Sequence, residues 1–122
     1  MVRLDHLTIL VRNVARSRAW YTENFGFTVE FEIAERRTVA LHDDGDLTLF
    51  LVETAASFSP SCTLTLQVDD VDVKYVELTA RGVVFDAAPQ QLFWGYGAEL
   101  RDPDGYLVHV WDETTMRDKG RG

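Results

Sequence analysis

The stretch LRDPDGYLVHVWD, residues 100–112, holds the clearest structural signal in the chain. It is typical of a strand end, a tight turn and a second strand. Pro103 presets the backbone for the turn, and Gly105 tolerates the positive φ that closes it. Strand alternation after the turn places three side chains on one face: Leu107, His109 and Trp111. A histidine in so apolar a strand is a candidate metal ligand, base or pocket wall.

The composition is that of one soluble globular domain over residues 1–122. Of the 122 residues, 46% are hydrophobic and 26% are charged, and the formal net charge is −8. So acidic a chain does not suit nucleic acid, but it suits a neutral or cationic small ligand. We find no membrane-spanning apolar run and no signal peptide, and the single cysteine, Cys62, excludes a disulfide framework. We therefore expect a cytoplasmic protein.

An internal repeat organises the chain, because residues 63–71 align without a gap on residues 6–14. In both halves this segment predicts a strand and then a helix that ends at a glycine. The predicted helices are residues 14–25, between Asn13 and Gly26, and residues 71–81, between Asp69 or Asp70 and Gly82. The other predicted strands are residues 4–11, 27–34, 36–42 and 46–53, then residues 83–87, 95–101 and 106–112. The order βαβββ thus occurs twice, in modules at residues 1–53 and 61–112, with a linker at residues 54–60 and a polar tail at residues 113–122.

The first strand of each module has an aliphatic face, expected under the helix, and a mixed face. The mixed faces are His6, Thr8 and Leu10 in one module, and Thr63, Thr65 and Gln67 in the other. Aligning Gly105 with Gly45 adds alternate residues of the last strands to this side: Leu47, Leu49 and Leu51, and Leu107, His109 and Trp111. The same alignment places Phe50 in the core. We predict an α+β fold whose two curved mixed sheets form an apolar cup with a few polar groups, which is typical of a small-molecule site.

Four motifs occur in a distinctive order: LDHLT at residues 4–8, WYTENFGF at residues 20–27, QVDDVD at residues 67–72, and WG with RDPDGY at residues 94–95 and 101–106. This arrangement resembles the vicinal oxygen chelate superfamily, which contains glyoxalase I, extradiol dioxygenases, fosfomycin resistance enzymes and bleomycin resistance proteins. The resemblance covers nearly the whole chain. It implies the glyoxalase/bleomycin-resistance/dioxygenase fold and a homodimer, without deciding whether the chains exchange modules.

The resemblance also implies four metal-ligand positions, in the first and last strands of the modules: His6, Leu49, Thr63 and His109. Leu49 cannot bind a metal, and Thr63 is a poor ligand for a transition metal. We therefore expect no tightly held cofactor, with a weakly bound divalent metal at His6 and His109 as the alternative. Without a metal, His6 is a cup-wall histidine. His109 is then the candidate general base or a binder of an anionic or hydroxyl group, unless it is simply a polar residue in a solvated cup.

Aromatic residues beside Gly95 and Gly97 predict a further part of the site. Phe93, Trp94 and Tyr96 would form a stacking platform or lid for a flat or cationic ligand, or else would pack on a dimer partner. The full set of ligand-binding candidates is His6, Thr8, Leu49, Thr63, Gln67, Trp94, Tyr96 and Trp111, with His109 as the catalytic candidate.

Three functions fit this pattern. The first is a small-molecule binder of the bleomycin-resistance type without a tightly held catalytic metal. The second is a metal-dependent lyase, isomerase or dioxygenase of the same superfamily that uses His6 and His109. The third is a dimeric protein whose cup is vestigial. The partners expected are a small-molecule ligand and a second copy of the chain, with no nucleic acid and no membrane.

Overall fold

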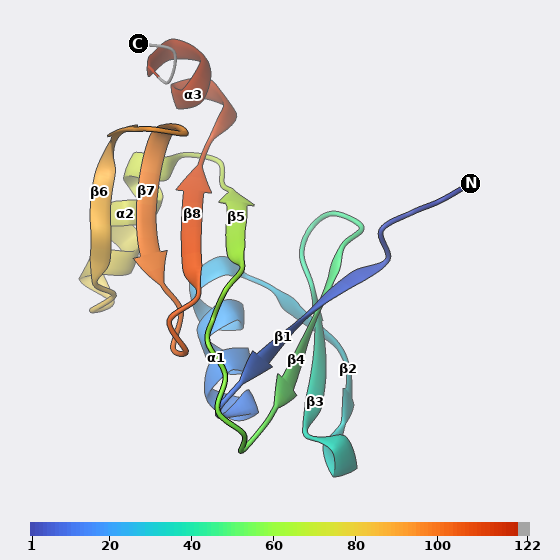
Figure 1. Cartoon of the computed structure of the whole chain (residues 1–122). Helices are drawn as coiled ribbons and strands as arrows, with labels where there is room; N and C mark the ends of the chain where they lie inside the picture. The colour runs from blue at the N-terminus through green and yellow to red at the C-terminus, as the bar shows by residue number, and fades with distance from the viewer. Residues whose placement is uncertain (120–122) are drawn as a thin grey trace. The chain divides into compact units, whose positions relative to one another are not determined.

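Strand β1 (His6–Val11) pairs in parallel with β4 (Thr48–Glu53), although the two are far apart in sequence. The computed structural model describes residues 1–119. The chain divides into two units, and the boundary between them in the sequence lies between Pro60 and Ser61. The other elements of the first unit are α1 (Val14–Phe25), β2 (Thr28–Ile33), η1 (Ala34–Arg36) and β3 (Thr38–His42). The sheet order is β1-β4-β3-β2, and the pairs other than β1·β4 are antiparallel (Figure 1).

The second unit repeats this topology and adds a helix. Its elements are β5 (Thr63–Gln67), α2 (Val71–Ala80), β6 (Phe85–Leu92), β7 (Gly95–Arg101), β8 (Leu107–Trp111) and α3 (Glu113–Lys119). The sheet order is β5-β8-β7-β6, with β5 and β8 parallel. Two four-stranded mixed sheets, each with a helix between its first two strands, confirm the predicted α+β class and the βαβββ repeat.

Helix caps follow the local sequence signals. The Asn13 side chain accepts a hydrogen bond from the Arg16 amide at 2.9 Å, and α1 ends at Gly26, whose φ of 71° is left-handed. For α2 the cap is Asp70, which accepts from the Val73 amide at 2.9 Å. None of the helices in the described part of the chain is long and apolar enough to cross a bilayer.

A carboxylate at the end of the last strand, or directly after it, also holds the first turn of the helix in each unit. The Val14 amide donates to Glu53 at 2.9 Å, and the Val71 amide donates to Asp112 at 2.6 Å. Both amides belong to the first residue of a helix and have no partner within it, so each carboxylate ties the helix to the sheet. This equivalence is independent evidence that the two units are copies of one module.

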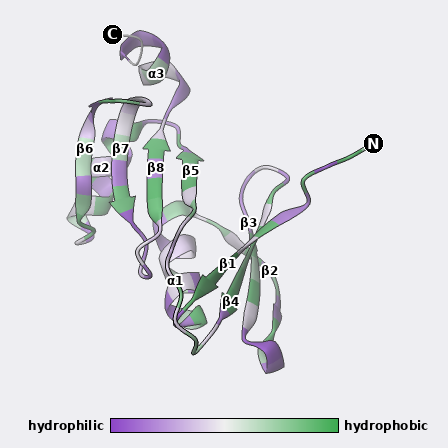
Figure 2. Cartoon of the chain, viewed as in Figure 1, coloured by the Kyte–Doolittle hydropathy of each residue, from purple (hydrophilic) through white to green (hydrophobic). Residues whose placement is uncertain are grey.

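The core of each unit lies between its helix and one face of its sheet. In the first unit the buried residues include Ile9, Val11, Tyr21, Leu49 and Leu51; in the second they include Val71, Leu78, Leu100, Val108 and Val110. Figure 2 shows that the strands carry many of the most hydrophobic residues, while the helices are more mixed, as elements with one solvent-facing side should be.

The predicted placement of Leu49 and Phe50 is wrong by one residue. Leu49 pairs with Leu7 and is only 6% exposed, so it belongs to the core, whereas Phe50 pairs with Thr8 and lies on the mixed face. The loops 43–47 and 102–106 have equal length, so Phe50 is the true counterpart of His109. The glycine alignment failed because the turns differ: Gly105 has a φ of 94°, whereas Gly45 is not among the glycines with positive φ.

Two further boundaries differ from the predictions. Strand β6 continues from residue 87 to Leu92, so the expected loop is instead a tight hairpin that turns at Phe93 and Trp94. The expected polar tail contains α3, whose first turn is capped by Asp112 through the Thr115 amide at 2.6 Å. Residues 120–122 of that tail lie outside the described part of the chain.

Candidate functional site

The second unit presents one sheet face that α2 does not cover. Residues paired across strands share a face, so Thr65, His109 and Glu99 form one row across β5, β8 and β7. Gln67 and Trp111 form the next row. Thr63, Thr65 and Gln67 are exposed, as predicted for a mixed face, whereas the alternate residues of β8 are buried beneath α2.

Trp94 lies over the middle row of this face. Its ring stacks on the His109 imidazole with the ring centres 4.5 Å apart and the planes 8° from parallel. The indole N–H donates to Glu99 Oε1 at 3.0 Å. A β-carbon on Gly97 would collide with the indole, so a glycine at this position lets the ring rest against the strand. These contacts fix the indole in one orientation.

His109 and Glu99 are both largely buried in this cluster, and their polar atoms have few hydrogen-bond partners among the described residues. Nε2 of His109 is buried and has no hydrogen-bond partner in the described residues, although it lies 3.4 Å from Glu99 Oε1. The His109 and Glu99 side chains are 12% and 20% exposed. The structure therefore places the predicted catalytic histidine on the expected face, but beneath an indole rather than open to solvent.

Tyr96 points to the other side of the sheet. It follows the buried Gly95 on β7, and its hydroxyl donates to Asp72 of α2 at 3.2 Å. Burial raises the pKa of Tyr96, and the hydrogen bond to the Asp72 carboxylate raises it further. Its predicted place in a stacking platform beside Trp94 is wrong, because Tyr96 alternates with Gly97 and Glu99 along β7 and therefore faces away from the row that Trp94 covers.

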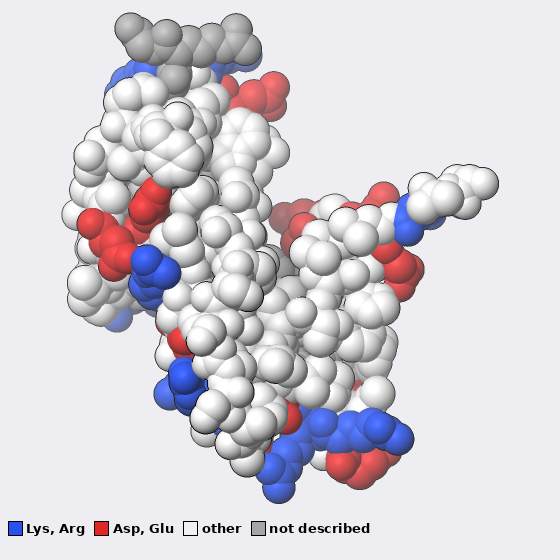
Figure 3. All heavy atoms as spheres, in the orientation of Figure 1, with Lys and Arg blue, Asp and Glu red and all other residues white. Residues whose placement is uncertain are grey.

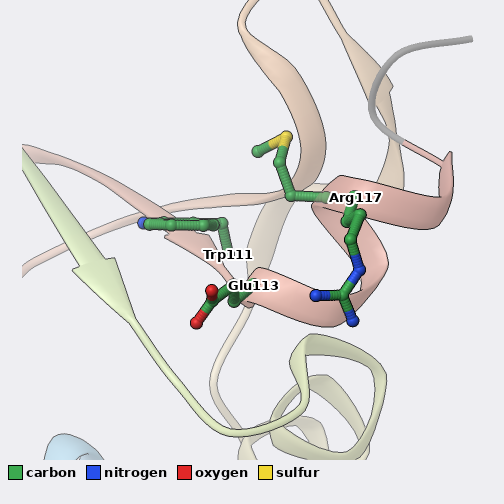
Figure 4. A pocket seen from close by; sticks show the side chains of 4 residues that line it. Trp111, Glu113 and Arg117 are labelled. Carbon is green, nitrogen blue, oxygen red and sulfur yellow. The ribbon is translucent and has the colours of Figure 1, made fainter.

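Trp111 lines a small pocket against α3. The other lining residues are Glu113, Met116 and Arg117, and Figure 4 shows Glu113 and Arg117 projecting from the helix beside the indole. The pocket holds about 250 Å³, below the roughly 300–1,000 Å³ of sites that enclose a drug-sized molecule. A ligand larger than a fragment would therefore use the open sheet face as well.

The mixed face of the first unit is aromatic. His6 stacks on Phe50 with ring centres 4.4 Å apart, and Phe31 meets Phe50 edge to face at 5.6 Å. Nδ1 of His6 lies 3.0 Å from the Asp5 carboxylate, and the His6 side chain is 41% exposed. Thr8 lies in the same row as Phe50. His6 is thus a wall residue of an exposed apolar face, whereas Leu49, a predicted wall residue, lies in the core.

Neither unit alone provides a shell for a tightly held divalent metal. Over residues 1–119, no three His, Cys, Asp or Glu side chains gather in a metal-binding arrangement. His6 belongs to the first unit and His109 to the second, and within the described residues one carboxylate lies near each ring. Transition metals held by proteins normally need three or four such ligands. A metal shared by the two histidines stays a prediction.

Sequence reasoning missed Glu99 and Phe50. Both could be found by counting outward from the two closing turns, since Arg101 pairs with Leu107 and His42 pairs with Thr48. The same counting sets Glu99 opposite His109. No sequence signal shows that the Trp94 side chain bends back over this row, because that depends on the hairpin between β6 and β7.

Comparison with known proteins gives a consistent result. Residues 3–110 match the family model described as Glyoxalase/Bleomycin resistance protein/Dioxygenase superfamily. TnmS3, an antibiotic binding protein from Streptomyces sp. CB03234, is 25% identical with a TM-score of 0.78, over 92% of this chain and 96% of that one. A member of the same superfamily from Sphaerobacter thermophilus is 24% identical with a TM-score of 0.78, over 93% and 98%.

An enzyme of this fold is also similar in structure. Lactoylglutathione lyase from Agrobacterium tumefaciens is 17% identical with a TM-score of 0.71, over 90% of this chain and 92% of that one. At that identity the likeness concerns the fold alone. No protein with a curated description matches the chain.

Proposed function

Because the chain belongs to the Glyoxalase/Bleomycin resistance protein/Dioxygenase superfamily, we propose that it is a binding protein for a flat aromatic small molecule, without a tightly held catalytic metal. The ligand would stack on Trp94 at the open sheet face of the second unit. The observation that carries the proposal is the fixed indole, held between His109 and Glu99. TnmS3, which is similar in structure, is described as an antibiotic binding protein, and this likeness supports the proposal.

A fixed indole is a good platform because a ligand need not order it. Stacking, the hydrogen bond and the contact with Gly97 already restrict both torsions of the Trp94 side chain. Pre-ordering of this kind reduces the entropy lost on binding. The indole is half-buried, so part of it remains available to a ligand. Thr65 and Gln67, both exposed, supply hydrogen-bonding groups around it.

Surface charge is compatible with a small neutral or cationic ligand. On the face drawn in Figure 3, Lys and Arg form small separate groups rather than one continuous basic tract. The net charge of −8 disfavours polyanions generally. The absence of a nucleic-acid partner, the homodimer and the cytoplasmic location remain predictions.

One observation favours a second candidate, an enzyme of the same superfamily that uses His109. The buried Nε2 has no hydrogen-bond partner among the described residues, and an imidazole nitrogen can act as a general base or as a metal ligand. Because Trp94 stacks against the imidazole, such chemistry would require the indole to move aside. The binding proposal needs no such movement, and we therefore prefer it.

The test is calorimetric titration with a panel of planar aromatic and glycopeptide antibiotics, preceded by a thermal-shift screen. Trp94→Ala should weaken binding at least about tenfold, the scale of one lost aromatic stack. Phe93→Ala is the matched control, because Phe93 occupies the same turn but is 94% exposed. A panel without any binder would refute the proposal. So would stoichiometric metal in untagged protein that is lost in His6→Ala and His109→Ala.

A further inference from the structure

Glu99 is a largely buried carboxylate without a basic partner. Its side chain is 20% exposed, and within the described residues no Lys or Arg lies within ion-pair distance of it. Three other carboxylates on the sheets do have such partners: Glu32 pairs with Arg18, Glu53 with Arg37, and Asp86 with Arg101. Glu30 on β2 also has no basic partner among the described residues, but its side chain is exposed and accepts a hydrogen bond from Thr48, whereas Glu99 is largely buried.

Both contacts of Glu99 use the same oxygen. The indole N–H of Trp94 and Nε2 of His109 lie 3.0 Å and 3.4 Å from Oε1. No described group hydrogen-bonds to Oε2. Burying a carboxylate costs free energy unless a positive charge or several hydrogen bonds compensate for it. One neutral indole N–H compensates only in part.

We propose that Glu99 is the anionic anchor of the site and binds the cationic group of a flat aromatic ligand. This inference rests on the proposed binding function and narrows its ligand class. A planar ligand stacked on Trp94 would place an amine or amidinium substituent against the free oxygen of Glu99. The charge would gain from the carboxylate and from the π face of the indole. Anionic ligands, phosphates included, are disfavoured by the same carboxylate.

Two dyes with one ring system separate charge from stacking. Proflavine is a cationic diaminoacridine near neutral pH, whereas acridine, its parent ring, is neutral there. The wild-type chain should bind proflavine at least about tenfold more tightly than acridine, as expected for a charge-assisted contact. Calorimetric titration of both dyes at low and at high salt measures this preference, which should shrink as salt rises.

Glu99→Gln tests the anchor without removing the platform. The glutamine keeps an oxygen that can accept the indole N–H of Trp94, but it carries no charge. Proflavine binding should weaken about tenfold, and acridine binding should stay within about twofold. Glu77→Gln is the control, because Glu77 is a 51% exposed carboxylate on α2, which packs on the other face of the sheet.

Each remaining outcome decides the matter. An unchanged preference for proflavine in Glu99→Gln overturns the inference, since the charge of Glu99 would then contribute nothing to binding. Equal weakening of both dyes also overturns it, since Glu99 would then only position Trp94. If the chain binds an uncharged antibiotic but neither dye, the inference fails and the proposed function stands. If the wild-type chain binds nothing aromatic, the proposed function itself fails.

Discussion

Replacing Asp112 should cost more stability than replacing any other carboxylate in the second unit. Asp112 is 1% exposed, and its two oxygens serve two helices. One accepts from the Val71 amide at the start of α2, and the other accepts from the Thr115 amide in the first turn of α3, both at 2.6 Å. No solvent can replace these bonds at a site so deeply buried.

The magnitude follows from the number of bonds lost. Removing a helix cap costs about 1 kcal/mol, and leaving a buried amide without an acceptor costs roughly 1–3 kcal/mol. Asp112→Ala loses two caps and leaves the Val71 amide unpaired, so we expect roughly 3 kcal/mol. Asp112→Asn keeps one oxygen but turns an amide donor toward the other helix, so we expect roughly half of that loss.

The pH dependence provides a sharper test. Burial raises the pKa of Asp112, but hydrogen bonds from Thr115 and from the Val71 and Thr114 amides outweigh it, so the net pKa lies below the ordinary 3.8. Because the pKa of Asp112 is lower in the folded than in the unfolded state, its carboxylate stabilises the fold at every pH above its unfolded-state pKa. This stabilisation disappears as the pH falls through the folded-state pKa. The gap between the wild type and Asp112→Asn should therefore be full near neutral pH and narrow below about pH 4.

Urea denaturation, followed by circular dichroism across this pH range, measures the gap. The slope of each transition shows whether a variant has also changed the cooperativity of the two units. A loss below about 0.5 kcal/mol for Asp112→Ala near neutral pH would refute the assigned role. A gap that widened in acid would refute the direction of the pKa shift.

Three further outcomes test the fold. Asp70→Ala should lose about 1 kcal/mol of unfolding free energy in urea melts, because its side chain caps α2. Its exposed neighbour Asp69 should tolerate alanine within about 0.5 kcal/mol, and equal losses in the two variants would contradict the capping role of Asp70. Gly26→Ala should cost about 1 kcal/mol of unfolding free energy from the left-handed backbone alone, since nothing lies within 4 Å of a new β-carbon. An unchanged unfolding free energy in the same melts would exclude that strain. Asp72→Asn should lower the pKa of Tyr96 toward 10.0 in an ultraviolet titration, and an unchanged titration would show that Asp72 does not contribute to the raised pKa.

The signals that the sequence carries reliably are local. Asn13 and Gly26 bound a helix because a side-chain acceptor and a left-handed residue satisfy its end groups, whatever surrounds it. Because the sequence repeats, the same prediction applies to the second unit, where Asp70 caps the helix as Asn13 does in the first. These interactions lie within a few residues of one another, so the order of elements could be predicted from the sequence.

The face that a strand residue occupies is harder to predict, because an error of one residue reverses it. Matching Gly45 to Gly105 looked reasonable, but only Gly105 adopts a positive φ, so the two glycines hold different places in their turns. Matching loop lengths instead would have set Phe50 on the mixed face. The contact between Trp94 and His109 could not be predicted in this way, because it depends on how a hairpin tip folds back.

The corrected register explains why the two units differ in chemistry while sharing one topology. Phe50 and His109 are equivalent, and their neighbours on the next strand are Ala40 and Glu99. The first unit thus has a small, fully buried alanine where the second has a carboxylate. An aromatic ring beside alanine offers a ligand only apolar contact, whereas the row with Glu99 also offers charge. Introducing a carboxylate with Ala40→Glu should therefore destabilise the first unit rather than create a second anchor, since Ala40 is 0% exposed. A stable Ala40→Glu variant that bound a second proflavine would show that the corrected register is not what separates the two units.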